Sequence, residues 1–120
     1  MKLKCRHVDV SEAGEEIYQA SFEEDRNQEG GPYVLIQRAF FPEEDGEPSP
    51  IYLETHDSTT IGHYPSLDTD LSRNRFVVRL PPPISEVIEV DFKATDKQFV
   101  KIRNILSIIF KKDLESNENA

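Results

Sequence analysis

The feature that most constrains the fold is a change in the spacing of apolar residues near the C-terminal end of the chain. Before residue 94, apolar and polar residues alternate in short stretches, for example over residues 87–93. A period of two predicts half-buried strands. From residue 95, apolar residues recur at steps of three and four, which predicts one amphipathic helix. That apolar stripe consists of Phe99, Ile102, Ile105 or Leu106, and Ile109.

This pattern predicts an α+β domain in which six to eight mostly antiparallel strands carry one C-terminal helix. Thr95 and Gln98 are three residues apart and form a capping box, which marks the start of the helix. Arg73 and Asn74 separate two strand-like stretches and predict a tight hairpin. The predicted strands cover residues 1–10, 17–22, 33–40, 51–55, 61–64, 68–71, 75–80 and 87–93.

The length of 120 residues suits a single domain, which we assign to residues 1–112, followed by a polar, disordered tail at 113–120. Cys5 is the one cysteine, so no internal disulfide can form, and its place in the first predicted strand favours a buried, inert thiol. No stretch resembles a signal peptide or a membrane-spanning helix. We therefore expect a cytoplasmic protein.

Negative charge is concentrated in the first half of the chain. Residues 1–50 contain twelve Asp and Glu against five Lys and Arg, whereas residues 51–120 contain eleven against nine. Much of the first excess lies in two stretches with loop composition, 23–29 and 43–47. The acidic total disfavours nucleic acid and anionic membrane as partners, because phosphate would be repelled. It favours a basic partner, or serves solubility alone.

One group of side chains raises the alternative of a metal site or an acid–base site. Glu54 and His56 are two apart and would share one face of a strand, and a hairpin could bring His63 beside them. Zinc accepts nitrogen and carboxylate ligands. The spacing matches no strong metal-binding signature, so surface histidines bonded to backbone or carboxylate are the simpler interpretation. No nucleophile elbow and no glycine-rich phosphate loop is present.

Gln37 and Arg38 are polar residues in an otherwise apolar strand. In the structural interpretation, Gln37 faces an edge of the sheet, and the Arg38 side chain extends to the surface and pairs with a carboxylate such as Glu54. In the functional interpretation both residues border a partner surface, where Arg is often a dominant contact.

Four short segments of the chain carry a family resemblance. They are Ile36-Gln37-Arg38, Tyr52-Leu53-Glu54, Gly62-His63-Tyr64 and Leu71-Ser72-Arg73-Asn74-Arg75. In this order they resemble the tenth numbered family of immunity proteins encoded beside polymorphic bacterial toxins, whose pattern has an L-Q-R strand, a Y-x-E strand, a turn containing Tyr and Gly, and an L-x-R-D-R hairpin. The similarity runs from about residue 33 to 110. The chain departs from the family pattern at the turn, where paired glycines are replaced, and after Asp57, where Ser follows instead of Gln.

The resemblance implies an antidote that binds a cognate toxin domain and blocks it, with no catalysis, no cofactor and no metal. A basic nuclease is one such toxin, and an acidic inhibitor would associate with it rapidly. Two further alternatives stay open: a small metal-binding or ligand-binding domain or enzyme that uses Glu54, His56 and His63, and a homodimer. We expect the toxin-facing surface to be bordered by Glu23, Glu24, Asp25, Glu29, Glu43, Glu44, Asp45 and Glu47.

Overall fold

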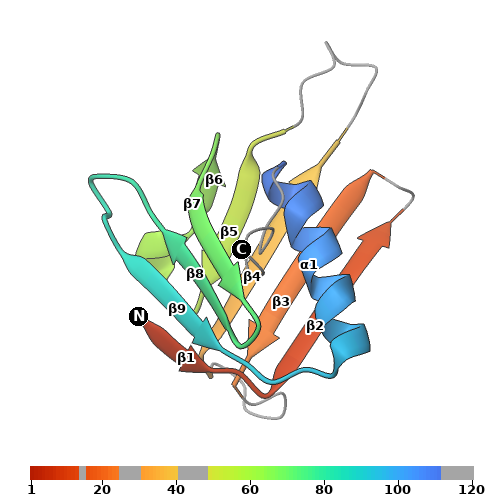
Figure 1. Ribbon diagram of the computed structural model, residues 1–120. Helices are drawn as coiled ribbons and strands as arrows, with labels where there is room; N and C mark the ends of the chain where they lie inside the picture. The colour runs from red at the N-terminus through yellow and green to blue at the C-terminus, as the bar shows by residue number, and fades with distance from the viewer. Residues whose placement is uncertain (14–15, 25–30, 41–48, 112–120) are drawn as a thin grey trace.

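The computed structural model describes residues 1–13, 16–24, 31–40 and 49–111 (Figure 1). Within this part the chain forms nine strands, one short 3-10 helix and one α-helix, so the predicted α+β class is confirmed. The strands are β1 (Lys2–Lys4), β2 (His7–Ala13), β3 (Ile17–Glu23), β4 (Tyr33–Ala39), β5 (Ile51–Thr55), β6 (Gly62–Tyr64), β7 (Asp68–Ser72), β8 (Arg75–Arg79) and β9 (Val87–Asp91). The helices are η1 (Ser58–Thr60) and α1 (Asp96–Phe110).

The strands form two sheets. A four-stranded sheet has the order β1-β9-β8-β7, and a five-stranded sheet has the order β2-β3-β4-β5-β6. All neighbours are antiparallel except β1 and β9, which are parallel. The stretch 1–10 is therefore not one strand: the chain bends at Cys5 and Arg6 and passes from one sheet to the other. The alternation continues through this bend, so the sequence pattern did not reveal it.

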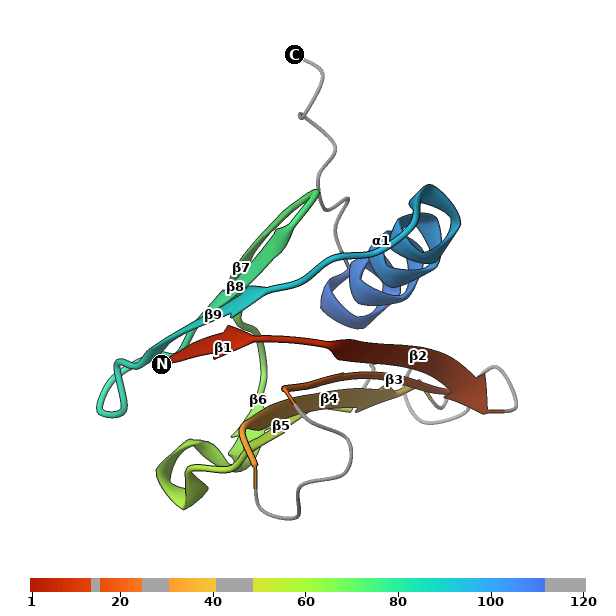
Figure 2. The ribbon, with the colours of Figure 1, turned by 90° about the horizontal axis from the view of Figure 1, so that it is seen from below.

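Helix α1 lies between the two sheets and packs on β2 and β3 (Figure 2). Its buried stripe is Phe99, Ile102, Leu106 and Ile109, as the periodicity predicted. The capping box is also confirmed, since the Thr95 side chain accepts from the Gln98 N–H and the Gln98 side chain accepts from the Thr95 N–H. At 15 residues, this one α-helix of the described part is too short to cross a membrane.

Aromatic rings join the two sheets in the core. The Phe22 ring, from the five-stranded sheet, stacks on Phe76 of the four-stranded sheet at 5.5 Å between ring centroids. The Phe92 ring contacts Phe22 and also stacks on Phe99 of α1, with 6.4 Å between the centroids of Phe92 and Phe99. These four side chains are all buried, so the interior is a single core shared by both sheets and the helix.

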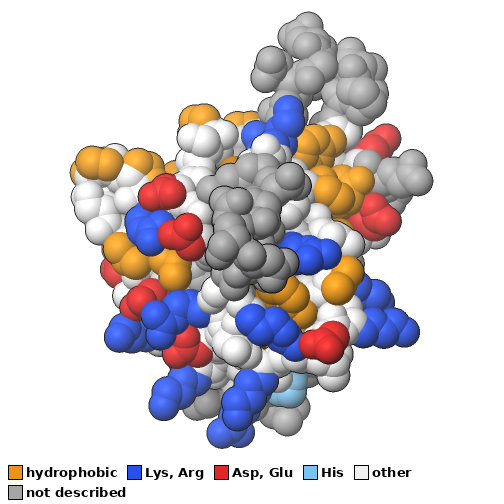
Figure 3. All heavy atoms as spheres, in the orientation of Figure 1, with side chains coloured by type: hydrophobic (Ala, Val, Ile, Leu, Met, Phe, Trp, Pro, Cys, Tyr) orange, Lys and Arg blue, Asp and Glu red, His pale blue; other side chains and the backbone are white. Residues whose placement is uncertain are grey.

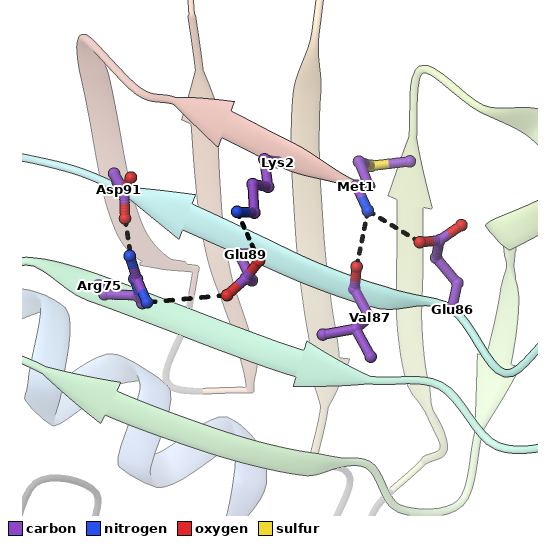
Figure 4. Close-up of polar contacts among 7 residues, drawn as sticks. All are labelled: Met1, Lys2, Arg75, Glu86, Val87, Glu89 and Asp91. Carbon is purple, nitrogen blue, oxygen red and sulfur yellow. Dashed lines mark hydrogen bonds and ion pairs between the residues drawn. The ribbon is translucent and has the colours of Figure 1, made fainter.

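The outer face of the four-stranded sheet is covered by paired charges (Figure 4). Arg75 bridges Asp91 at 3.0 Å and Glu89 at 3.7 Å, and Lys2 lies 3.8 Å from Glu89. Further along, Arg79 lies 2.8 Å from Asp70. These charged side chains thus pair with one another within the sheet itself.

Candidate functional site

The outer face of the five-stranded sheet differs from that of the other sheet in its side chains. Where no other sheet is named, "outer face" means the side of the five-stranded sheet that points away from α1. No α-helix or strand of the described residues lies over this side (Figure 2). The strand alternation places apolar residues of β4 and β5 inward and mixed residues outward. The outward set includes Gln19, Tyr33, Leu35, Gln37, Tyr52, Glu54 and His63.

The strand register arranges part of this set in one row across four strands. Gln19 lies opposite Gln37, Gln37 opposite Tyr52, and Tyr52 opposite His63. The Gln37 amide donates to Gln19 Oε1 at 2.6 Å, and the rings of Tyr52 and His63 are 5.1 Å apart. Cross-strand contacts of this kind hold side chains in fixed positions. The row is therefore a preformed surface of aromatic and amide groups.

Glu54 lies beside this row and is held by two tyrosines. The Tyr33 hydroxyl donates to Glu54 Oε2 at 2.5 Å, and the Tyr52 hydroxyl donates to Oε1 at 2.5 Å. Tyr33 comes from β4 and Tyr52 from β5, so neighbouring strands fix the carboxylate from two sides. Hydrogen bonds to an ionised carboxylate are short and strong.

These hydrogen bonds favour the charged form of Glu54. The bond from Tyr33, followed by the bond from Tyr52, lowers the pKa of Glu54 below its ordinary value. The same bond to Glu54 raises the pKa of Tyr33 to about 12, and the bond to Glu54 also raises the pKa of Tyr52. At neutral pH the cluster is thus a fixed negative charge between two neutral phenol rings.

Such a cluster is suited to accept a cation from outside. Arginine stacks on aromatic faces and pairs with carboxylates, and lysine lies over aromatic rings as well. Both oxygens of Glu54 retain lone pairs after accepting one tyrosine each, because a carboxylate offers about four acceptor positions. The half-buried Leu35 lies opposite Glu54 on β4 and adds an apolar contact.

The structure does not support a metal site at Glu54, His56 and His63. His56 is exposed, and its Nδ1 accepts from the Tyr33 backbone N–H at 3.2 Å. His63 lies against the Tyr52 ring, and Glu54 is bound by both tyrosines. Among the residues that the structure describes, no three His, Cys, Asp or Glu side chains converge as metal ligands would. The simpler interpretation of the histidines fits better: His56 accepts from a backbone N–H.

Gln37 and Arg38 point to opposite sides of the sheet. Gln37 lies on the outer face in the central strand β4, so the prediction that it faces an edge of the sheet was wrong. The pairing of Arg38 with Glu54 was wrong, because Arg38 faces inward and is 8% exposed. Its Nη1 donates to the carbonyl of Ile109 at 2.8 Å, and its Nε donates to the carbonyl of Ser49 at 2.8 Å. Arg38 of β4 therefore has a structural role: it binds the C-terminal end of α1.

The predicted acidic partner residues are only partly within the described chain. Glu23 is the last residue of β3, not a loop residue, and it lies opposite Tyr33 on the outer face. Glu24 follows, and its Oε2 accepts from the Lys4 N–H at 3.0 Å. The other predicted partner residues lie outside the described residues; they are Asp25, Glu29, Glu43, Glu44, Asp45 and Glu47.

The negative charge of the protein is concentrated outside the described part. The described residues contain thirteen acidic and twelve basic side chains, a balance of −1, whereas the whole chain has −9. Two of the remaining acidic segments connect to β4. One leaves from Glu24 and returns at Gly31, and the other leaves after Phe40 and returns at Ser49. Their anchors are thus at opposite ends of β4, about 20 Å apart.

The tyrosines that bind Glu54 were not recognised from the sequence. The Tyr-x-Glu spacing of Tyr52 and Glu54 was a usable signal, because residues two apart share one face of a strand. Tyr33 is 21 positions from Glu54, so only the register of β4 against β5 could place it. No family model matches the chain, and no curated protein matches it.

Proposed function

We propose that this protein binds a cognate toxin domain and blocks its activity, without catalysing a reaction. The observation that carries the proposal is the outer face of the five-stranded sheet, where two tyrosines hold the Glu54 carboxylate in its charged form. Aromatic residues are enriched in protein interfaces, and rigid side chains lose little entropy on binding. The resemblance to toxin-neutralising immunity proteins supports the same conclusion.

The charge distribution supports a basic partner. A toxin that acts on nucleic acid must present cations to hold phosphate. An Arg or Lys from such a surface would enter the Tyr33–Glu54–Tyr52 cluster, while the acidic segments at the two ends of β4 would increase the association rate. By contrast, the charges on the outer face of the four-stranded sheet already pair with one another.

The first experiment is co-expression with the product of the neighbouring toxin gene. We expect the wild-type protein to restore growth and to co-purify with the toxin domain. Glu54→Lys should abolish both, because it places a cation where the partner's cation would bind. Asp68→Lys is the matched control: it makes the same charge change on the exposed outer face of the other sheet and should still protect.

Thermal melts of both variants would confirm that they fold. A folded Glu54→Lys variant that protects cells as well as the wild type would refute the assignment of the outer face. Failure of the wild-type protein to bind or protect would refute the toxin partner itself.

A further inference from the structure

A second surface, distinct from the outer face, lies between β2 and α1 on the inner side of the five-stranded sheet. A cavity of about 250 Å³ opens there. Its apolar part consists of Val8 and Val10 of β2 and Ile102 of α1. Its basic part consists of Arg6, Lys93 and Lys101. We call this surface the β2–α1 groove.

The groove runs beside a free sheet edge. Strand β2 pairs with β3 on one side, and no described strand pairs with it on the other. In a strand, backbone N–H and C=O groups alternate between the two sides, so an edge strand presents a row of groups able to pair with a further strand. Val8 and Val10 point inward yet are only half-buried, because α1 covers β3 more fully than β2.

The charges at the groove are not balanced. Arg6, Lys93 and Lys101 are all exposed, and none forms an ion pair with a described residue. Among the described residues that line the groove, Asp9 carries a carboxylate. Lys and Arg side chains are visible along the lower part of the molecule, where β1 ends and the chain passes from β9 to α1 (Figure 3). Three cations at one groove that form no ion pair within the described part of the chain are notable in a protein with a net charge of −9.

We propose that the β2–α1 groove binds an extended, acidic segment of a partner protein, which adds a strand to the free edge of β2. An edge strand beside a helix offers both parts of this recognition mode: backbone hydrogen bonds along the edge, and a groove for alternate side chains. The apolar floor would take one side chain of the segment, and the cations would pair with acidic side chains next to it.

Other occupants fit the groove less well. The volume of about 250 Å³ is below the range of about 300–1,000 Å³ that is usual for small-molecule sites. Nucleic acid would be repelled by the net charge of the whole chain, and it has no use for a strand edge. This inference does not depend on the toxin proposal, because it concerns different residues and a different side of the sheet.

The test uses a defined probe, a fluorescein-labelled peptide of eight alternating Val and Glu residues with blocked ends, at 0.15 M salt. Fluorescence anisotropy measures its binding to the full chain. We expect Lys93→Glu/Lys101→Glu to weaken binding about tenfold or more, since each reversed charge replaces an attraction by a repulsion. Lys2→Glu/Lys111→Glu is the matched control: it has the same net charge, its two positions are outside the groove, and Lys111 lies at the opposite end of α1. It should change affinity less than about twofold.

Two further peptides separate strand addition from simple charge attraction. The same peptide N-methylated at every residue keeps its charges but cannot donate backbone hydrogen bonds, and it should not bind. A Val–Lys peptide should not bind either. Hydrogen exchange should slow at β2 amides when the Val–Glu peptide is bound.

Several results would overturn the proposal. They are equal binding of the N-methylated peptide, equal weakening by the two double variants, and absence of binding at millimolar peptide. A stable dimer of the protein with its β2 amides protected would instead assign the edge to a second copy of the chain.

Discussion

Replacing Arg38 tests whether this residue stabilises the fold, in contrast to its neighbour Gln37, which lies on the outer face. Arg38 is buried and donates hydrogen bonds to the carbonyls of Ile109 and Ser49. It thereby ties the C-terminal end of α1 to Ser49, two residues before β5. Arg38→Met keeps much of the apolar volume and removes both donors and the charge.

The expected loss of stability follows from these contacts. Hydrogen bonds from charged donors contribute about 1.5–3 kcal/mol each, and a cation at the C-terminal end of a helix adds about 0.3–1 kcal/mol. Burial of the guanidinium opposes this gain and lowers the pKa of Arg38. We therefore expect a net loss of about 3 kcal/mol, which is a large part of the usual stability of about 5–15 kcal/mol.

Urea unfolding followed by circular dichroism measures the loss. With a slope of about 2 kcal/mol/M, the midpoint should fall by about 1.5 M. Gln37→Met is the control, because Gln37 immediately precedes Arg38 in the same strand and points outward. The urea midpoint of this variant should move by less than about 0.3 M. Equal midpoints for Arg38→Met and the wild type would show that the two hydrogen bonds do not stabilise the fold.

Three further predictions concern single interactions. The double variant Tyr33→Phe/Tyr52→Phe should raise the pKa of Glu54 toward its ordinary value in an NMR titration. Because the pKa of Glu54 is depressed in the folded state, the stability that this carboxylate contributes above its ordinary pKa should also shrink. An unchanged titration would contradict the two hydrogen bonds. The Cys5 thiol, whose pKa is raised by burial to about 11, should react with a disulfide reagent at pH 8 only as the protein unfolds, and fast reaction of the folded protein would contradict its burial. Thr95→Ala should cost about 1 kcal/mol in urea unfolding through loss of the helix cap, and no cost would contradict the capping box.

The local structure of the chain was largely predictable because each element depends on neighbours in sequence. The capping box at Thr95, the buried stripe of α1 and the hairpin at Arg73 and Asn74 follow from spacing alone. The alternation in β8 also gave the correct inward side for Phe76 and Val78. These are signals over two to four residues, and no tertiary contact overrides them.

The division into two sheets and the placement of Arg38 were not predictable in the same way. The bend at Cys5 leaves no mark in the pattern, because both strands that flank it alternate. The predicted pairing of Arg38 with Glu54 assumed that the arginine side chain extends to the surface. The residue positions in β4 and β5 put them on opposite faces, and the carbonyl that Arg38 meets belongs to Ile109, 71 positions away.

The residues of the candidate site could also not be grouped from the sequence, because their proximity depends on the strand register. Glu54 was identified from the sequence, but as part of a metal site with two histidines. The side chains that do meet it, Tyr33 and Tyr52, come from paired strands, and only the register makes them neighbours. A cluster formed across strands is visible only after the strands are paired.

The most direct test of the central claim is hydroxyl-radical footprinting of the protein alone and in complex with the cognate toxin domain. The account predicts that oxidation of Tyr33, Tyr52 and His63 falls in the complex, while oxidation of the exposed Ile84, away from the outer face, stays the same. Unchanged oxidation of all three outer-face residues in a complex that forms and neutralises the toxin would contradict the claim that this face is the docking surface.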